Sequence, residues 1–175
     1  NFDVVLGPGG LPVLYRGGQP HTCGELESLR ALGVKSILKL NACGSRESDE
    51  ERKAKALGFR VLSLDFNALN IGTSSTCSKV GEALAFLKDP DNVPVFVHCA
   101  EGKDRTGYIV GLYEKTFLHT PTADVLSELH CHGHRGLLRS LFMGQIPREL
   151  AREVPACSTS IPSRSEMTGG RGPDS

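Results

Sequence analysis

An apolar run that ends directly at a cysteine is the feature that most constrains how this chain can fold. Residues 93–97 read Val-Pro-Val-Phe-Val, and residues 98–107 that follow read HCAEGKDRTG. The apolar run has the length and composition of a buried strand. Residues 106–118 favour a helix, so we predict a strand, a short loop and a helix in that order. This is the repeating unit of α/β folds.

The loop between this strand and helix has the composition of an anion-binding site. The backbone N–H groups of Ala100 to Arg105 can turn inward together and form a nest for an anion. Arg105 can donate two parallel N–H groups to two phosphate oxygens, which a lysine cannot do. Gly102 can bend the loop where a side chain would clash with the phosphate, and Gly107 permits close packing where the helix starts. The loop therefore predicts a site for a phosphate group.

Cys99 would lie at the floor of this loop, beside Arg105 and a helix N-terminus. These surroundings favour thiolate over thiol, which lowers the pKa of a cysteine. Thr106 can donate its hydroxyl to the thiolate, and His98 can orient the loop through backbone groups. A lone cysteine at the end of a buried strand is usually a small hydrophobic residue. Here the cysteine, arginine, glycines and threonine coincide in register, so we predict that Cys99 is a nucleophile.

At these residues the chain resembles a known family. HCAEGKDRTG is similar to the HC-x5-R-[ST]-G loop of the protein tyrosine phosphatase superfamily, in particular its dual-specificity and atypical branches. Residues 15–20, YRGGQP, resemble the YR-x-GQP segment of the atypical and plant-fungal-type enzymes. Residues 29–40, LRALGVKSILKL, are similar to the helix and strand that follow in them. The resemblance spans residues 14–118 and implies a phosphatase with a cysteinyl-phosphate intermediate.

The leaving oxygen of such a reaction needs a proton, normally from a carboxylic acid on a mobile loop. Asp65 ends the strand before the nucleophile strand, about where related enzymes carry their acid, although aspartate is also common there as a cap or turn residue. Asp104 is the rival. GKDRTG resembles the loop of bacterial phosphatases that act on phosphoinositides and phosphotyrosine, in which the loop aspartate is implicated as the acid. Asp104 could instead pair with a cation and brace the loop. Both remain open, and we place Asp65 first.

Two charged residues at the rim of the loop bear on the substrate. Lys103 adds a point charge, and in related loops such lysines accompany inositol phosphate or phosphoinositide substrates. An equally good interpretation is that Lys103 is a solvated surface lysine. The negative charge of Glu101 also opposes that of Lys103. We therefore expect a protein tyrosine or dual-specificity phosphatase, with a phosphoinositide or inositol phosphate phosphatase as the alternative. A catalytically weak, phosphate-binding pseudophosphatase is the alternative from another class. A rhodanese-type sulfurtransferase would not demand the Arg105–Thr106 pair.

The predicted site has a nucleophile, a phosphate clamp and an acid. Its predicted catalytic residues are Cys99, Arg105, Asp65, Asp104 and Thr106, and its predicted substrate-binding residues are Ala100, Glu101, Gly102, Lys103, Asp104 and Arg105. We expect no metal and no cofactor, because the arginine and the amides supply the charge that a metal would. His130, Cys131, His132 and His134 look like metal ligands, but residues two apart on a helix point to different sides.

The rest of the chain predicts one α/β domain over residues 1–154 and a flexible tail over residues 155–175, which is rich in Ser, Pro and Gly. Strands are predicted at 13–16, 36–40, 60–64 and 94–98, and helices at 25–32, 45–57, 79–87, 106–118, 122–131 and 137–143. Strands separated by helices favour a central, mostly parallel sheet of four to five strands.

Charge and cysteine usage bound the partners and the compartment. The formal net charge is zero, so no overall field recruits nucleic acid. The six cysteines lack the close spacing of a disulfide scaffold, and a low-pKa thiolate needs a reducing compartment. No apolar run has membrane-spanning length. We expect a cytoplasmic monomer whose partner is a phosphorylated protein or an inositol phosphate or phosphoinositide.

Overall fold

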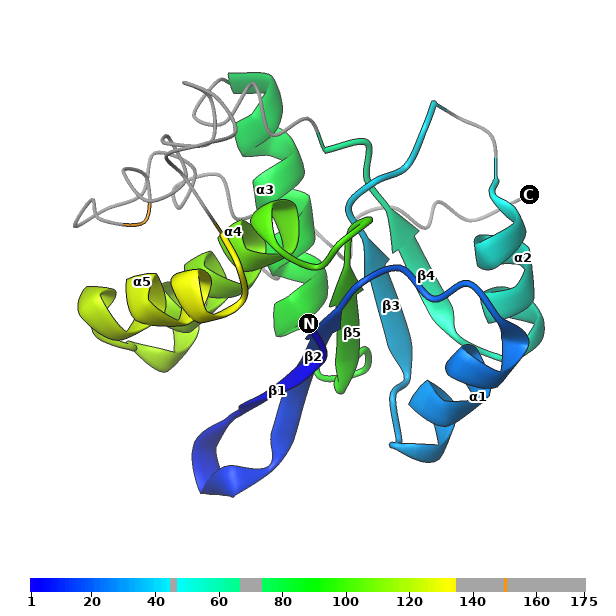
Figure 1. Ribbon diagram of the computed structural model, residues 1–175, viewed down its shortest axis with the longest axis horizontal. Helices are drawn as coiled ribbons and strands as arrows, with labels where there is room; N and C mark the ends of the chain where they lie inside the picture. The colour runs from blue at the N-terminus through cyan, green and yellow to red at the C-terminus, as the bar shows by residue number, and fades with distance from the viewer. Residues whose placement is uncertain (45–46, 67–73, 135–149, 151–175) are drawn as a thin grey trace, which may run out of the picture.

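The computed structural model describes residues 1–44, 47–66, 74–134 and 150, and its centre is a five-stranded sheet (Figure 1). The strand order is β1-β2-β5-β3-β4. β1 pairs antiparallel with β2, and every other pair is parallel. This confirms the predicted α/β class with a mostly parallel sheet. The strands are β1 (Asp3–Leu6), β2 (Pro12–Gly17), β3 (Ser36–Lys39), β4 (Arg60–Ser63) and β5 (Val95–His98).

Helices cover both faces of the sheet (Figure 1). They are α1 (Cys23–Ala31), α2 (Asp49–Ala56), α3 (Ser74–Lys88), α4 (Asp104–Tyr113) and α5 (Thr122–Cys131). Because side chains alternate along a strand, each strand supplies both faces. Leu38 and Val97 lie in the core with α3, α4 and α5, whereas Ile37 and Phe96 lie in the smaller core with α1 and α2. Two hydrophobic layers thus hold the sheet between them.

Two helices begin at a capping box, in which the cap side chain and a glutamate three residues later satisfy each other's backbone N–H groups. Thr22 and Glu25 form the box of α1, and Ser48 and Glu51 form that of α2. The predicted helix over 45–57 therefore starts too early. The true start is fixed by Ser48, whose hydroxyl accepts the N–H of Glu51 at 3.2 Å.

Several other predicted boundaries differ from the structure. α4 begins at Asp104, before the predicted residue 106, and continues as a π-helical turn over Glu114–Leu118. α3 is longer than the predicted helix over 79–87. β1 and the short 3-10 helix at Pro8–Gly10 were not predicted. The predicted helix over 137–143 and the predicted tail lie outside the described residues.

The sheet brings three segments to one edge. Gly17 of β2 and Lys39 of β3 are both register partners of His98 at the end of β5. Because parallel strands share their carboxyl ends, the YRGGQP segment, the residues after β3 and the loop after β5 meet there, where α/β proteins bind ligands. In the part of the chain that the structure describes, no helix is both long and apolar enough to cross a membrane.

Candidate active site

The loop after β5 has its carbonyl groups turned outward. Three consecutive carbonyls accept hydrogen bonds from groups outside the loop: Ala100 from the N–H of Gln19 at 3.3 Å, Glu101 from the side-chain amide of Asn1 at 2.9 Å, and Gly102 from Nη2 of Arg16 at 3.3 Å. Inside the loop, the N–H groups of Gly102 and Thr106 donate toward the sulfur of Cys99. Outward carbonyls and inward N–H groups are the geometry of an anion-binding nest.

Two glycines allow this loop to sit where it does. Gly102 has a φ of 72°, and a Cβ built on it would lie 2.4 Å from the carbonyl carbon and oxygen of Gly17. A side chain at Gly102 would therefore clash with the backbone of Gly17 at the end of β2. A Cβ on Gly107 would lie 2.5 Å from Leu129 Cδ1, so this glycine lets α4 pack closely on α5, as expected.

Cys99 lies at the floor of the loop and is 3% exposed. Burial raises the pKa of its thiol, but donation from the hydroxyl and N–H of Thr106, the charge of Arg105 and the N–H of Gly102 outweigh it. The pKa of Cys99 ends below its ordinary value of 9.0. The Thr106 hydroxyl is fully buried and makes no other hydrogen bond among the described residues, so its proton is available to a thiolate at Cys99. The surroundings thus favour a thiolate, which is what a nucleophilic cysteine requires.

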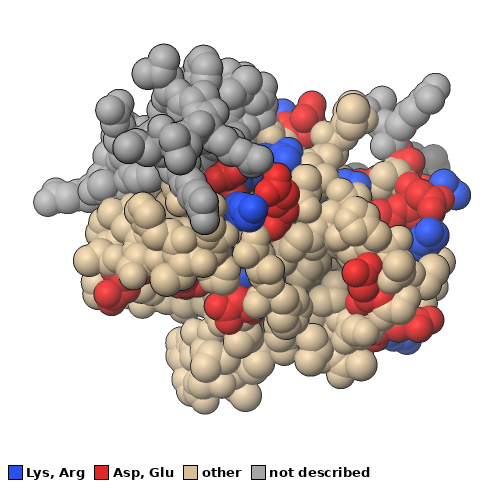
Figure 2. Space-filling model, in the orientation of Figure 1, with Lys and Arg blue, Asp and Glu red and all other residues tan. Residues whose placement is uncertain are grey.

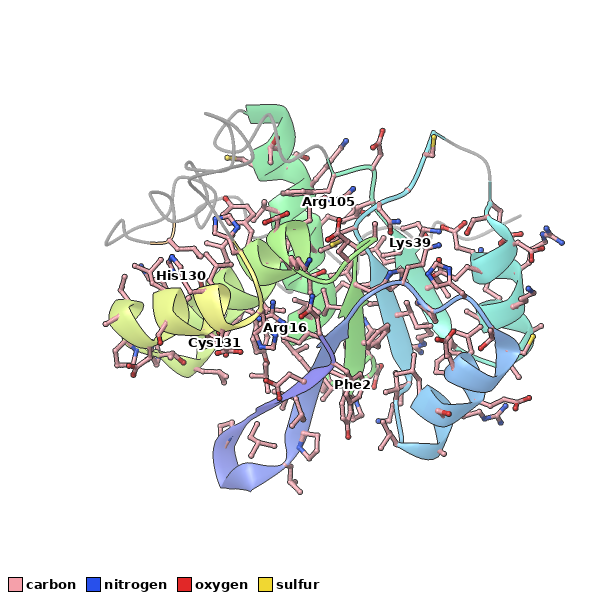
Figure 3. The ribbon with its side chains drawn as sticks, viewed as in Figure 1. Phe2, Arg16, Lys39, Arg105, His130 and Cys131 are labelled. Carbon is pink, nitrogen blue, oxygen red and sulfur yellow. The ribbon has the colours of Figure 1, made fainter. Side chains whose placement is uncertain are left out.

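Arg105 is held by the end of the neighbouring strand. Its Nη1 donates to the carbonyl of Leu40 at 3.3 Å, and the N–H of Leu40 donates to the carbonyl of His98 at 2.9 Å. Figure 3 shows Arg105 near the carboxyl end of β5, where the loop begins. The residue after β3 therefore positions both the guanidinium and the strand that carries Cys99.

Arg16 is a second arginine against the loop, and it is only 2% exposed. Besides donating to Gly102, it places Nη1 3.6 Å from Oε1 of Glu128 on α5. Burial lowers the pKa of Arg16, and the negative charges of Glu128 and Glu114 oppose that shift. Figure 3 shows Arg16 between β2 and the α4–α5 layer. Arg16 thus ties the outer side of the loop to two elements of the scaffold.

A buried polar cluster lies on the α2 side of the loop. One carboxylate oxygen of Glu50 is 2.7 Å from Nε2 of His98, and the other is 3.1 Å from Nζ of Lys39 and accepts from Nε2 of Gln19 at 2.7 Å. Burial raises the pKa of Glu50, but His98 and Lys39 lower it further, so it ends below its ordinary value. The residue before Cys99 is therefore fixed by a charged network.

The two predicted acids lie in different surroundings. Asp65 follows the edge strand β4, forms an isolated bridge with Asn41, and has an exposed side chain. Its carbonyl accepts a hydrogen bond from Nζ of Lys79. Asp104 begins α4 in the loop itself, and its Oδ1 is 2.7 Å from Nδ1 of the buried His134. Asp104 therefore has a bracing partner, and the choice of acid stays a prediction.

The rim charges of the loop pair with each other. Nζ of Lys103 is 2.8 Å from Oε2 of Glu101, so the two charges largely cancel at that point. Figure 2 shows the same pattern on one face of the molecule, where basic and acidic side chains lie next to one another. The formal net charge of zero agrees with this.

The histidine cluster of α5 is divided among different partners. His130 and Cys131 are exposed on α5 (Figure 3). His134 instead contacts Asp104. Of the residues described, only Asp3, Glu128 and His132 place ligand atoms close enough to share a metal ion, within 4.8 Å of one another. Arg16 lies 3.6 Å from one of these carboxylate oxygens, and its charge opposes a bound cation.

Sequence reasoning missed the residues that hold the loop from outside. Arg16 and Gln19 were visible only as part of the YRGGQP resemblance. Glu50 lies in a charged stretch that reads as a solvated helix face, and His134 lies among other histidines. A glutamate three residues after a threonine or serine predicts the caps, but no sequence pattern predicts these contacts between distant elements.

Comparisons with known proteins agree with this geometry. A family model described as DSP-PTPase phosphatase fused to NAD+ kinase matches residues 11–143. Inositol diphosphatase DSP4 of Arabidopsis thaliana is 33% identical over 104 residues, which are 58% of this chain and 51% of that protein. The chain thus spans about half the length of this curated relative.

Solved structures give the same fold. The core catalytic domain of the PP-IP phosphatase SIW14 from S. cerevisiae, in complex with citrate, is 26% identical with a TM-score of 0.62, over 83% of this chain and 82% of that one. TpbA of P. aeruginosa is 23% identical with a TM-score of 0.61, over 77% and 78%. The family match covers most of the chain, including β2, β5 and the loop with Cys99 and Arg105. The chain therefore belongs to the family described as DSP-PTPase phosphatase fused to NAD+ kinase, within the atypical dual-specificity group of the protein tyrosine phosphatase superfamily.

Proposed function

We propose that this protein is a phosphatase that works through a cysteinyl-phosphate and removes the terminal phosphate from the diphosphate group of diphosphoinositol phosphates. The observation that carries the chemistry is the nest around Cys99, in which Thr106, Arg105 and Gly102 lower the pKa of the thiol. The substrate rests on the relatives, which are named as an inositol diphosphatase and a PP-IP phosphatase.

In the first step, the Cys99 thiolate attacks the terminal phosphorus in line. An S–P bond forms while the P–O bond to the leaving group breaks, and the leaving oxygen keeps the electron pair. Arg105 and the inward N–H groups hold the three equatorial oxygens as charge develops on them. In the second step, water attacks the cysteinyl-phosphate, the S–P bond breaks, and the thiolate is restored with release of orthophosphate.

The leaving group decides how much the reaction needs an acid. A phosphate leaving group has a pKa of about 6, whereas the phenol of tyrosine has a pKa of about 10. A phosphate leaves as an anion with little proton transfer, while an alcohol or phenol needs a donor such as Asp65 or Asp104. Cleavage of a diphosphate is therefore the reaction that depends least on where the acid carboxyl lies.

Hydrolysis of phosphotyrosine or other phosphoprotein residues is the second candidate. The observation that favours it is the rim of the loop, where the 2.8 Å pair of Lys103 with Glu101 leaves little net positive charge. A substrate with many phosphates would gain more from an unpaired lysine there. On this alternative, the acid would be Asp65, with its exposed side chain at the end of β4.

Release of orthophosphate from three substrates decides between the candidates. The substrates are a diphosphoinositol phosphate, inositol hexakisphosphate as its match without the diphosphate, and a phosphotyrosine peptide. We expect the highest kcat/KM on the first, no turnover of any substrate by Cys99→Ser, and normal turnover by the control Cys43→Ser, whose thiol is exposed and free. A higher kcat/KM on the peptide would contradict the proposed substrate and favour phosphoproteins instead.

The acid is assigned with aryl phosphates whose leaving phenols differ in pKa. Asp65→Asn is expected to slow the poor leaving groups most, because they need the proton most. Loss in Asp104→Asn with full activity in Asp65→Asn would place the acid in the loop. Orthophosphate binding without turnover of any substrate would identify a pseudophosphatase and contradict the proposed function.

A further inference from the structure

The segment that follows α5 contacts the phosphate loop through one buried side chain. Nδ1 of His134 lies 2.7 Å from Oδ1 of Asp104. The His134 side chain is fully buried, whereas the Asp104 side chain is 21% exposed. The contact joins the end of α5 to the first residue of α4, which is also the last part of the loop.

The chemistry of the two groups fixes which way the hydrogen bond runs. A carboxylate has no hydrogen to donate, whereas a histidine ring nitrogen that carries a proton donates it. Nδ1 of His134 therefore carries the proton and donates to Oδ1 of Asp104 at 2.7 Å. His134 is then the donor, and the Asp104 carboxylate is the acceptor.

The backbone around His134 holds the ring in place. The N–H of His134 donates to the carbonyl of Leu129 at 3.2 Å, and Gly133 turns the chain with a φ of 82°. The alkyl chain of Lys103 passes 3.4 Å from the position of a Cβ on Gly133. Residues 133 and 134 thus pack against two consecutive residues of the loop, Lys103 and Asp104.

We propose that His134 is a positioning residue of the phosphate loop. By holding Asp104, it fixes the first turn of α4, from which Arg105 and Thr106 reach the phosphate and the sulfur. His134 holds the loop near its C-terminal end, after the point where Arg16 donates to the carbonyl of Gly102 at 3.3 Å. This inference rests on the proposed function in that it concerns the same phosphate site.

The test compares two replacements of His134 that differ in where they place an N–H group. In His134→Asn, the side-chain amide can occupy the position of Nδ1, whereas in His134→Gln it reaches toward the position of Nε2. We expect His134→Gln to raise the dissociation constant of orthophosphate about tenfold, the change that loss of a hydrogen bond to a charged group produces. His134→Asn should stay within about twofold of wild type. Equal dissociation constants in wild type and both variants would overturn the proposal.

A double-mutant cycle shows whether the effect passes through Asp104. Asp104→Ala should raise the dissociation constant of orthophosphate by a similar factor, and adding His134→Gln to it should change little more. Fully additive effects would overturn the proposal. The control is His130→Asn on the exposed face of α5, whose Nδ1 contacts only the carbonyl of Leu126 at 2.7 Å; it should leave the constant unchanged.

A spectroscopic measurement keeps the test independent of folding defects and of turnover. The imidazole nitrogens of His134 in the wild-type chain should show the proton on Nδ1, and Asp104→Ala should change that signal while His130→Asn should not. An unchanged signal would overturn the proposal. Orthophosphate binding is measured without any substrate, so a chain that binds phosphate but never turns over contradicts the proposed function and still tests the role of His134.

Discussion

Oε1 of Glu50 lies 2.7 Å from Nε2 of His98, so a carboxylate from α2 contacts the residue immediately before Cys99. The same carboxylate reaches Lys39, which is 3% exposed. A buried lysine and a buried histidine therefore share one counter-charge. The Glu50 carboxylate therefore links the position of α2 to the position of the nucleophile.

Glu50→Gln should destabilise the protein, because it leaves Lys39 buried without its counter-charge. Removing one partner of a buried pair costs about 3–5 kcal/mol. The pKa of Glu50 is lowered in the folded state, so its contribution is present above its ordinary value of 4.5 and is lost as the pH falls through the folded value. Urea unfolding at pH 7 and in acid should show a difference that shrinks in acid. The neighbouring control, Asp49→Asn, removes an exposed charge and should hardly move the midpoint.

Thr106→Val should raise the pKa of Cys99, because the hydroxyl that donates to the thiolate is lost while the buried volume is kept. At a fixed neutral pH, less of the thiol is then ionised, and alkylation by iodoacetamide slows. Thr106→Ser keeps the donor and should retain most of the wild-type rate. The pH profile of alkylation measures the shift directly, and a profile for Thr106→Val identical to that of wild type would contradict this role of the hydroxyl.

Gly102→Ala should cost at least about 100-fold in kcat/KM, because the loop must move to relieve the new Cβ, and small misplacements of catalytic groups have effects of that size. The Cβ would lie 2.4 Å from the backbone of Gly17 at a φ of 72°. Gly33→Ala is the matched control, since its φ is 84° with no atom within 4 Å of the Cβ. It carries the same backbone strain without the contact and should retain activity. Similar activity in both variants would contradict a role for the close approach of Gly102 to the backbone of Gly17.

Glu114→Gln should stabilise the protein at alkaline pH. Burial and the neighbouring Glu128 raise the pKa of Glu114 from 4.5 to about 8. Between these pH values, the folded state holds a proton that the unfolded state has released, so this group makes stability fall as pH rises. The variant should lack that slope and exceed wild type by on the order of 2–4 kcal/mol at pH 9. The exposed Glu82→Gln on α3 is the control, and thermal unfolding from pH 5 to 9 is the measurement.

Local patterns predicted the elements that make the site. The apolar alternation of β3, the continuous apolar run of β5 and the glycines after α1 and α2 placed most strands and helices correctly. β1 was not predicted because Asp3–Leu6 is four residues long with only one buried side chain. It forms a strand because it pairs with β2. The sequence does not distinguish the π-helical turn after Tyr113 from the α-helix before it, because both contain helix-forming residues.

Contacts between distant elements could not be predicted in the same way. Cys99, Arg105 and Thr106 stand within one short segment, so their joint chemistry is readable from spacing. Glu50 and His98, or Asp104 and His134, meet only because the sheet order and the packing of α5 bring them together. Spacing alone could not choose between a catalytic and a bracing role for Asp104, since the choice depends on such a contact.

β5 lies between β2 and β3 in the sheet and is hydrogen-bonded to both. A strand hydrogen-bonded on both sides belongs to the part of a domain that opens last in hydrogen exchange. The nucleophile is therefore anchored in the most persistent part of the molecule, while β1, α5 and the rim of the loop surround it from the periphery. Substitutions in that periphery leave the pairing of β5 with β2 and β3 in place.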